Sequence, residues 1–361
     1  MRPLSNSENS SAGCVRHSSA GSGGIGLHGE APVVPDTRRL IRKSRVTIRM
    51  GRWLRDWLAV HLPARLFTDP ALFSLYEDRG WHVTPAHFYE PIPDTRELSD
   101  KVWSSPSSLC GVDLHQQFQL DLLRTFSSKF RSEYNRFPAC SGDLTRFHFD
   151  QTLFCSVDAE LLYCMIRHFK PRTMIEIGSG MSTLLAAEAI QQNETEGNPC
   201  RFVAIEPHPK EFLRRGIPGL TELLETKVQS LPVARFSALE ANDIVFIDSS
   251  HVIKTGGDVV YEYLEILPRL KPGVIIHCHD IFLPAEYPKQ WVLTDHRFWT
   301  EQYLLQAFLA FNTSYEVLMA GSSLHLYHSL ELKAAFASYD PATAWPGSFW
   351  MRRALTDRRT A

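Results

Sequence analysis

The sequence predicts an α/β fold with a mostly parallel sheet of seven strands, helices on both faces and a C-terminal antiparallel hairpin strand. From residue 172 onward, short apolar segments alternate with longer segments of helical spacing, which is typical of such a sheet. A glycine turn at 178–180 joins the first apolar segment to the helix after it. Farther on, Gly321-Ser322-Ser323 stands between two short apolar segments and predicts the hairpin.

Each element has its own signal in the sequence. The predicted strands are the apolar segments 172–177, 201–205, 226–228, 243–247, 273–279, 315–319 and 324–328. Helices are predicted from the glycine turn to about 193 and at 210–215, 257–270 and 301–312. Before the sheet, 114–137 and 157–169 are predicted as amphipathic helices. The apolar face expected for the first of these consists of Phe118, Leu122, Leu123, Phe126 and Phe130.

Composition divides the chain into four segments. Residues 1–35 are rich in Ser and Gly and poor in large apolar side chains, so we expect a disordered leader. A helical N-terminal extension is expected over 36–155, and it includes a proline- and aromatic-rich strap that cannot form a regular helix. The α/β domain is expected over 156–330, followed by a C-terminal tail over 331–361.

The segment 38–65 is strongly basic, and its large apolar side chains recur at helical spacing: Trp53, Leu54, Trp57, Leu58 and Leu62. The favoured interpretation is a helix that packs this apolar face against the domain. The alternative is an amphipathic helix on an anionic membrane surface, which would make a peripheral membrane contact.

Charge and cysteine content exclude several classes of protein. The formal net charge is −2, whereas proteins that bind nucleic acid generally carry a basic excess. The 7 cysteines are scattered without a CxxC pair, which favours a reducing compartment over a disulfide framework or a structural zinc site. No apolar run approaches the roughly 18 residues of a membrane span. We therefore expect a cytoplasmic protein with no nucleic-acid partner and no transmembrane segment.

The strand, turn and helix around Gly178 and Gly180 are typical of a crevice that binds a nucleotide-like ligand. Glycine lets the backbone turn sharply and lets a ligand approach it, and the helix start offers unpaired N–H groups and a positive dipole end. A dinucleotide-binding turn would have a third small residue where Thr183 stands, so NAD is less favoured. Glu206 follows the second strand, where a carboxylate can accept both hydroxyls of a ribose.

Several segments together resemble a known family. The sequences EIGSGMST, AIEP and DIVFIDSSH are similar to the successive motifs of class I S-adenosylmethionine-dependent methyltransferases. HVTPAHFYEPIPD, VDAELLY and VIIHCHDIFLPAEYPKQWV further resemble a bacterial group often labelled methyltransferase family 24. The likeness covers roughly residues 75 to 330. It implies the Rossmann-like class I fold and S-adenosylmethionine as the cofactor, and it leaves the methyl acceptor open.

The resemblance also implies which residues contact the cofactor. Glu176 and Gly178 would border its methionine part, and Gly180 would lie under its ribose. Glu206 would hold the ribose hydroxyls, and Gln229 would lie beside the adenine. The full set implied in this way is Glu176, Gly178, Ser179, Gly180, Thr183, Glu206, Gln229 and Asp248.

A second group of polar side chains follows the fourth and fifth predicted strands: Asp248, His251, His279 and Asp280. Because the carboxyl ends of parallel strands meet at one edge of a sheet, Asp248 and Asp280 are expected to face the same crevice. Alternation along the fifth strand places His277 on the same face as His279 but deeper, so His277 is interpreted as a packed histidine.

Two chemical roles are open for this group. In the favoured one, His251 or Asp280 is the general base that deprotonates an acceptor hydroxyl or amine. In the other, Asp248, His251, His279 and Asp280 hold a divalent metal that lowers the pKa of the acceptor. Metal-dependent O-methyltransferases of this fold usually follow the fifth-strand acid with an oxygen ligand such as Asn, whereas Ile281 follows Asp280 here.

Aromatic and acidic side chains in two proline-rich segments are candidates for contact with the acceptor: Tyr89, Glu286, Tyr287 and Trp291. An equally weighted interpretation is that these side chains pack their own segments onto the domain. Further candidates for the border of the pocket are Lys254, Trp299, Glu301 and Tyr303.

The sequence therefore predicts methyl transfer from S-adenosylmethionine to a small or medium-sized polar acceptor, with oxygen favoured over nitrogen. The reaction would be a base-assisted displacement, in which positioning supplies much of the rate. One alternative is a metal-dependent hydroxylase or oxygenase built on the same fold. Another is a catalytically inactive scaffold that binds the cofactor, because a fold alone does not establish a function. The sequence leaves the oligomeric state open.

Overall fold

The computed structural model describes residues 51–355, except 52, 55–56, 58–60, 64–65, 67–68, 141–142, 144, 150 and 152. The predicted leader and most of the basic segment 38–65 therefore lie outside the described residues. The chain divides into two compact units, residues 1–82 and 83–361, and each is described by itself. In the first unit, helix α3 (Pro70–Glu77) is capped by Asp69, whose carboxylate accepts a hydrogen bond of 2.9 Å from the backbone N–H of Ala71.

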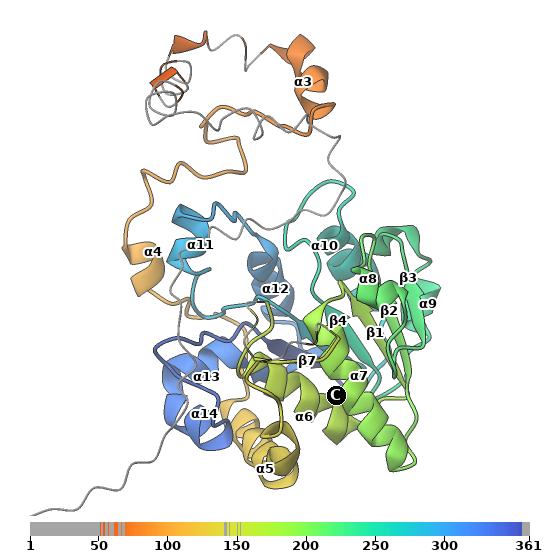
Figure 1. Cartoon of the computed structure of the whole chain (residues 1–361). Helices are drawn as coiled ribbons and strands as arrows, with labels where there is room; N and C mark the ends of the chain where they lie inside the picture. Colours follow the sequence, from red (N-terminus) through yellow and green to blue (C-terminus); the bar gives the residue numbers. More distant parts are fainter. Residues whose placement is uncertain are drawn as a thin grey trace, which may run out of the picture. The chain divides into compact units, whose positions relative to one another are not determined.

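The second unit is built around a seven-stranded sheet (Figure 1). Its strands are β1 (Thr173–Ile177), β2 (Arg201–Ile205), β3 (Glu222–Leu224), β4 (Ile244–Ile247), β5 (Ile275–Cys278), β6 (Tyr315–Ala320) and β7 (Phe349–Arg353). Its α-helices are α4 (Lys101–Ser104), α5 (Gln116–Tyr134), α6 (Asp158–Phe169), α7 (Met181–Thr195), α8 (Glu211–Arg214), α9 (Ala234–Ser237), α10 (Asp258–Tyr261), α11 (Lys289–Leu293), α12 (Glu301–Leu309), α13 (Gly321–Tyr327) and α14 (Ser329–Ala335). Three further turns are the 3₁₀-helices η2 (Val228–Ser230) and η4 (Leu267–Arg269) and the π-helix η3 (Glu262–Ile266). Among the described helices, none has the length and apolar character that crossing a bilayer requires.

The strand order in the sheet is β3-β2-β1-β4-β5-β7-β6. The first five strands of this order run parallel to one another, and β7 is antiparallel to both of its neighbours, β5 and β6. This confirms the predicted seven-stranded, mostly parallel sheet with one antiparallel strand. Because β4 pairs directly with β5, the residues after these strands lie at neighbouring positions on one edge of the sheet.

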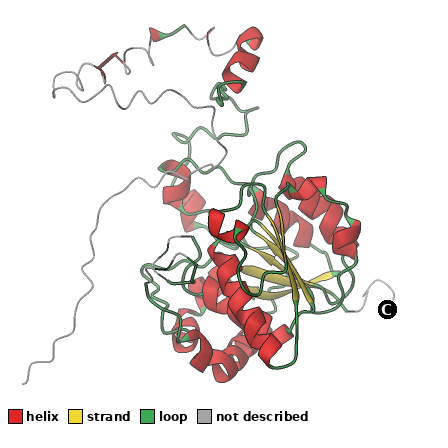
Figure 2. Ribbon diagram, turned by 45° about the vertical axis from the view of Figure 1, so that its right-hand side comes forward, coloured by secondary structure: helices red, strands yellow, loops and turns green. Residues whose placement is uncertain are grey.

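Helices cover both faces of the sheet, as predicted (Figure 2). Alternate strand residues point to opposite faces. Met174 of β1 and Phe246 of β4 join an apolar core that includes side chains of α5, α6 and α7. Their neighbours Ile175 and Val245 join a second core that includes side chains of α10, η3 and α12. The central strands are therefore buried on both sides, which explains their continuous apolar sequences.

The hairpin predicted at 321–323 is wrong. Gly321 begins helix α13, and the segment 324–328, predicted as a strand, is helical as far as Tyr327. The backbone N–H of Gly321 donates a hydrogen bond of 2.9 Å to the carbonyl of Ser348, so a contact with a distant residue fixes the backbone here. The antiparallel strand of the sheet is β7, which lies within the segment predicted to be a C-terminal tail.

Smaller predictions also changed. The third strand was predicted at 226–228, but β3 lies a few residues earlier, and Val228 begins η2 instead. Helix α5 confirms the predicted helix before the sheet, although Phe118, expected on its apolar face, is 44% exposed. The strap at 80–94 contains no helix or strand, as its prolines predict.

The N-terminal extension contacts the loop that follows β5, and Figure 1 shows α4 beside α11. The indole N–H of Trp103 donates to the carbonyl of Tyr287 at 2.9 Å, and the backbone N–H of Ser107 donates to the carbonyl of Pro284 at 2.8 Å. Lys289 on α11 forms an ion pair of 2.6 Å with Asp100. Residues 100–107 therefore hold a loop that borders the carboxyl edge of the sheet.

Candidate active site

The turn between β1 and α7 passes directly against the end of β4. Gly178 has a φ of +84°, and a Cβ atom at this position would lie 1.9 Å from the backbone oxygen of Asp248. The backbone N–H of Asp248 in turn donates to the carbonyl of Ile177 at 2.9 Å. Only glycine allows both this conformation and this approach. The turn after β1 and the loop after β4 are therefore in direct backbone contact.

Helix α7 begins beside open space. A Cβ atom on Gly180 would meet no atom within 4 Å, and its backbone N–H donates to the hydroxyl oxygen of Thr183 at 2.9 Å. Thr183 is fully buried and is used in this cap, so its side chain holds the turn. Gly180 thus leaves room for a ligand at the positive end of the helix.

Glu206 joins the end of β2 to the glycine turn. One of its carboxylate oxygens accepts a hydrogen bond from the backbone N–H of His208 at 2.7 Å. The other accepts from the backbone N–H of Ser179 at 3.3 Å. The side chain is half-buried at the carboxyl edge of the sheet, beside the predicted cofactor turn.

Glu176 is fully buried beneath the same turn. The hydroxyl of Ser182 donates to one carboxylate oxygen at 2.7 Å. Burial raises the pKa of Glu176 to about 8, although its hydrogen bond with Ser182 opposes this shift. The side chain is therefore protonated at neutral pH.

Three of the predicted cofactor residues carry a buried polar atom without a hydrogen-bond partner: the second carboxylate oxygen of Glu176, the hydroxyl of Ser179 and the amide oxygen of Gln229. The amide nitrogen of Gln229, on η2, donates to the carbonyl of Gly256 at 3.3 Å. Buried polar atoms in proteins almost always have partners. Unpartnered atoms around a glycine turn with open space fit a polar ligand such as S-adenosylmethionine.

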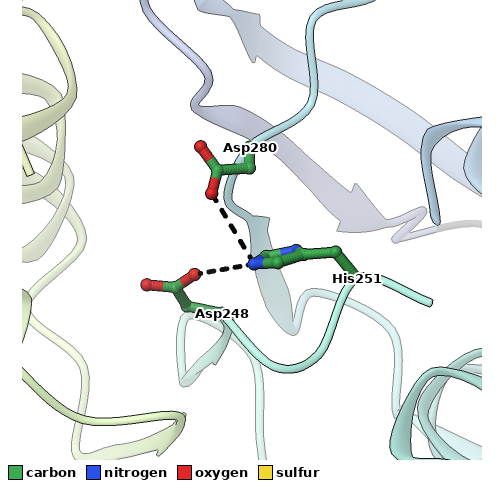
Figure 3. Close-up of side chains that lie close together, drawn as sticks. All are labelled: Asp248, His251 and Asp280. Carbon is green, nitrogen blue, oxygen red and sulfur yellow. Dashed lines mark ion pairs between the residues drawn. The ribbon is translucent and has the colours of Figure 1, made fainter. Parts of the chain in front are cut away.

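Asp248, His251 and Asp280 point toward one another at the ends of β4 and β5 (Figure 3). The Nε2 atom of His251 lies 3.3 Å from Oδ1 of Asp248 and 3.6 Å from Oδ2 of Asp280. His251 and Asp280 both have positive φ angles, 59° and 56°, which non-glycine residues rarely adopt. These three side chains therefore meet at the carboxyl edge of the sheet, and the crevice expected in front of them stays a prediction.

The other ring nitrogen of His251 contacts a carboxylate that comes from a distant helix. Nδ1 of His251 lies 2.9 Å from Oε2 of Glu301, which is fully buried at the start of α12. The hydroxyl of Tyr263 donates to the second oxygen of Glu301 at 2.9 Å. The indole ring of Trp299 stacks on the imidazole with a centroid distance of 4.3 Å. His251 is thus held by carboxylates at both ring nitrogens and by the tilted ring of Trp299.

His279 lies on the other side of Asp248. Its Nδ1 is 3.6 Å from Oδ1 of Asp248 and 3.7 Å from Oδ1 of Asp280. Its Nε2 is 3.5 Å from Oδ2 of Asp158 on α6, which also accepts hydrogen bonds from the backbone N–H groups of Gly347 and Ser348. The sequence prediction therefore brought His279 to the correct cluster but missed Asp158.

His277 is packed, as predicted. Its ring lies 4.3 Å from the rings of both Phe246 and Trp350, and its Nε2 contacts the hydroxyl of Ser348 at 3.0 Å. Burial lowers the pKa of His277 well below its ordinary value. This histidine is neutral and forms part of the core below the cluster.

The histidines and aspartates of this cluster shift one another's pKa values in different directions. Burial alone would lower the pKa values of His251 and His279, but the surrounding carboxylates raise both well above the ordinary histidine value. Burial would raise the pKa of Asp248, but His279 and His251 hold it below its usual range. Burial raises the pKa of Asp280, and the two histidines only partly oppose that shift. The carboxylates therefore favour the charged form of both histidines, and the histidines favour the charged form of Asp248.

The arrangement suits two kinds of chemistry. A carboxylate of raised pKa beside an open crevice can accept a proton from an acceptor. The ligand atoms of Asp248, His251 and Asp280 also lie within 4.8 Å of one another, and an imidazole with two carboxylates is a donor set that divalent transition metals accept. His279 lies outside this metal-sized group among the described residues, so the four-residue metal set predicted from the sequence reduces to three.

The residues predicted to contact the acceptor have different environments. The carboxylate of Glu286 accepts hydrogen bonds from Tyr303 and Gln302 at 2.7 and 3.0 Å. The hydroxyl of Tyr287, which is buried, accepts from the backbone N–H of Gln302 at 3.0 Å. Both side chains are thus engaged inside their own loop. The ring centroid of Trp291 lies 5.1 Å from that of Trp299, and Trp299 in turn contacts His251.

Tyr89 is 84% exposed, and its ring packs 4.3 Å from the ring of Phe88. A contact between Tyr89 and the acceptor therefore stays a prediction. Glu301 and Trp299 were only secondary candidates in the sequence, although both contact His251 directly. No spacing rule links His251 to residues about 50 positions later. Asp158 stood inside a segment that resembles the family but carried no assigned role.

Comparison with protein families finds that residues 175–281 match the family model described as "Methyltransferase domain". An uncharacterized protein from Archaeoglobus fulgidus is 30% identical over 179 residues, which cover 47% of this chain and 80% of that protein. The family match confirms the predicted methyltransferase domain and spans the glycine turn and the cluster at the ends of β4 and β5.

Solved structures with similarity to the chain include the O-methyltransferase TomG from Streptomyces achromogenes, involved in tomaymycin synthesis, in complex with S-adenosylmethionine. The TM-score is 0.34 and the identity 14%, over 65% of this chain and 90% of that one. The methyltransferase PaMTH1 from Podospora anserina, bound to S-adenosylhomocysteine, gives a TM-score of 0.34 and 19% identity, over 66% of this chain and 88% of that one. An O-methyltransferase from Bacillus cereus gives a TM-score of 0.33 and 14% identity, over 66% of this chain and 90% of that one.

Proposed function

We propose that this chain, which belongs to the class I S-adenosylmethionine-dependent methyltransferases, transfers a methyl group to an oxygen atom of a small or medium-sized polar acceptor. S-adenosylmethionine supplies the activated methyl group when bound. The observation that carries the proposal is the double contact of Asp248: its backbone oxygen adjoins Gly178 of the glycine turn, and its carboxylate reaches His251. Groups suited to the donor and groups suited to the acceptor therefore meet at one residue.

In this proposal, the glycine turn and Glu206 bind the donor. The backbone at Gly178 and Gly180 lies against it, and the Glu206 carboxylate accepts hydrogen bonds from its ribose hydroxyls. Glu206 already receives a hydrogen bond from Ser179, so the carboxylate is fixed in the turn before the donor arrives. Gln229 contributes its unpartnered amide oxygen to the adenine side.

Asp280 is the proposed general base. The surrounding carboxylates raise the pKa of His251 well above its ordinary value, which favours the protonated ring, and that form has no lone pair to accept a proton from the acceptor. Its imidazolium instead lies between Asp248 and Asp280 and keeps the two carboxylates from repelling each other. Asp280 retains 18% side-chain exposure, which leaves its carboxylate accessible to an acceptor hydroxyl. Positioning and proton acceptance together would then support the displacement.

The test combines calorimetry with turnover. Asp280→Asn should bind S-adenosylmethionine as the native chain does, and it should lose about tenfold or more of the rate of S-adenosylhomocysteine formation with hydroxylated acceptors. Asp121→Asn, which changes an exposed carboxylate on α5, is the matched control and should retain both properties. Full turnover by Asp280→Asn would refute the assignment of the base.

A second candidate is metal-assisted methyl transfer, favoured by the proximity of the ligand atoms of Asp248, His251 and Asp280. In that case, a bound divalent cation would acidify the acceptor hydroxyl. Turnover that is lost with a chelator and restored by a divalent metal would select this candidate. Turnover unchanged by the chelator would select base catalysis.

The same experiments separate the two remaining alternatives from the sequence. Tightly bound iron in the purified chain, with no heat change on adding S-adenosylmethionine, would indicate a hydroxylase or oxygenase. Binding of S-adenosylmethionine without turnover across a broad acceptor panel would indicate a scaffold that binds the cofactor. Either result would overturn the proposed O-methylation.

A further inference from the structure

Arg297 lies against two tryptophan rings in the loop between α11 and α12. Its guanidinium carbon is 4.6 Å from the ring centroid of Trp291 and 5.4 Å from that of Trp299. The backbone N–H of Arg297 donates to the carbonyl of Trp291 at 2.8 Å, which closes the loop. Cation–π contacts with both rings fix the position of the guanidinium and leave its N–H groups free to bind an anion.

The charge of Arg297 has no close partner in the described structure. Its Nε atom is buried without a hydrogen bond, and the nearest ion-pair contact, with Oδ2 of Asp295, is 3.9 Å long. The buried Arg167 on α6 shows the contrast, because its guanidinium donates to Glu133, Glu196 and Asn193. A half-buried guanidinium whose ion pair is as long as 3.9 Å can accept a closer anionic partner.

Arg297 is also close to the catalytic cluster. The ring centroid of Trp299 lies 4.3 Å from the imidazole centroid of His251 and 5.4 Å from the guanidinium carbon of Arg297. The imidazole and the guanidinium can therefore be no farther apart than the sum of these two distances. Asp280 in turn lies 3.6 Å from Nε2 of His251, so a small molecule has the length to place one polar group near Arg297 and a hydroxyl near Asp280.

We propose that Arg297 binds an anionic group of the methyl acceptor, and that the acceptor is a hydroxylated carboxylic acid; this inference rests on the proposed methyl transfer. A planar carboxylate matches the paired N–H donors of a guanidinium. A singly charged carboxylate also suffers less repulsion from Asp248, Asp280 and Glu301 than a doubly charged phosphate would. Arg297 would then select the acceptor, while Asp280 would act on its hydroxyl.

The test measures binding of matched acids and amides to the chain loaded with S-adenosylhomocysteine. The probes are the ortho, meta and para isomers of hydroxybenzoate and the corresponding hydroxybenzamides. We expect at least one hydroxybenzoate to bind about tenfold more tightly than its amide, because only the carboxylate can form charge-assisted hydrogen bonds with the guanidinium of Arg297. Arg297→Gln should abolish this preference, and Arg297→Lys should restore only part of it.

Two controls keep the result interpretable. Arg297→Gln should retain the thermal unfolding temperature and the S-adenosylhomocysteine affinity of the native chain. Arg215→Gln, which changes an exposed arginine paired with Glu211, should leave the preference intact. Equal binding of acids and amides, absence of binding by every acid, or an unchanged preference in Arg297→Gln would each overturn the inference.

The outcome also distinguishes this inference from the proposed function. If the native chain methylates neutral hydroxylated acceptors and Arg297→Gln does so equally well, the proposed O-methylation is supported and the role of Arg297 in binding the acceptor is refuted. If acids bind through Arg297 but S-adenosylmethionine gives no turnover with any acceptor, the anion site is supported and the proposed methyl transfer is refuted.

Discussion

His251 is surrounded by carboxylates that come from three different segments of the chain. Asp248 and Asp280 follow adjacent strands, and Glu301 begins α12. The three negative charges stabilise the imidazolium, which in turn holds the two aspartates a short distance apart. At the scale of single residues, this histidine is therefore held by its neighbours, and in the proposed mechanism the carboxylate that accepts the proton is Asp280.

The donor site makes a direct prediction for Glu206. Glu206→Ala should weaken S-adenosylmethionine binding about tenfold or more, because it removes a charged acceptor of ribose hydroxyls and a bond to the turn. Isothermal titration calorimetry measures this loss. Glu225→Ala, an exposed carboxylate after β3, should leave the affinity unchanged. Unchanged affinity in Glu206→Ala would show that the ribose lies elsewhere.

Glu176 predicts a pH dependence of stability. Its pKa rises from 4.5 in a solvated chain to about 8 in the folded protein. The stability contributed by its neutral form is therefore fully present below 4.5 and is lost as the pH rises through about 8. Each unit of pKa shift corresponds to about 1.4 kcal/mol.

Glu176→Gln should remove this dependence, because the amide stays neutral. In denaturant unfolding of the ligand-free chain, the difference in stability between the variant and the native protein should depend on pH. It should favour the variant by roughly several kcal/mol more at pH 9 than at pH 5. Glu211→Gln, on the exposed side of α8, should show no such gain. A difference between variant and native protein that stays constant with pH would contradict the prediction.

At the scale of elements, the β1–turn–α7 unit uses its two glycines for different purposes. Gly178 has a positive φ and adjoins the backbone of Asp248, whereas Gly180 is extended and faces open space. The first glycine is needed for folding, and the second keeps room for a ligand.

This difference predicts opposite outcomes for two alanine variants. Gly178→Ala should lower the free energy of unfolding by more than about 2 kcal/mol, because its Cβ would collide with Asp248 and its φ would be strained. Gly180→Ala should stay within about 1 kcal/mol of the native stability and lose S-adenosylmethionine affinity. Denaturant unfolding and calorimetry measure the two effects. Equal destabilisation by both would contradict this division of roles.

The same unit shows how far sequence reasoning reaches. The strands around Glu176 and Asp248 could be predicted because their apolar runs and terminal acids are local signals. The turn predicted at Gly321 failed because its local chemistry is overridden: the hydroxyl of Ser322 donates to the carbonyl of Phe282 at 2.6 Å and accepts from Trp345. Such contacts form between residues that are distant in the sequence, so the residues around Gly321 carry no local pattern that predicts them.

At the scale of the whole molecule, the same limit applies to the site. Asp248, His251 and Asp280 follow strands that could be recognised, so their meeting was predictable. Glu301 and Arg297 belong to a loop and helix whose position depends on the packing of α11 and α12. Their roles could be found only once the chain was folded in three dimensions.

Strand β7 joins β6 to the five parallel strands of the sheet, because it pairs with β5 on one side and β6 on the other. Trp350 at its centre is fully buried against His277. Trp350→Ala should therefore cost about 3–5 kcal/mol of stability in denaturant unfolding. Leu330→Ala, which changes a side chain 81% exposed on α14, should cost less than about 0.5 kcal/mol. Comparable losses in both would mean that β7 does not stabilise the sheet.

The late position of β7 in the chain also bears on how the protein is made. Among the strands that the structure describes, β6 pairs in the sheet with β7 alone, and β7 (Phe349–Arg353) follows it in the chain. A nascent chain therefore exposes the apolar edge of β5 and the unpaired strand β6 until β7 has been synthesised. We expect the sheet to close only once β7 is available to pair with both strands, so a chain that still lacks β7 would expose edges that can aggregate.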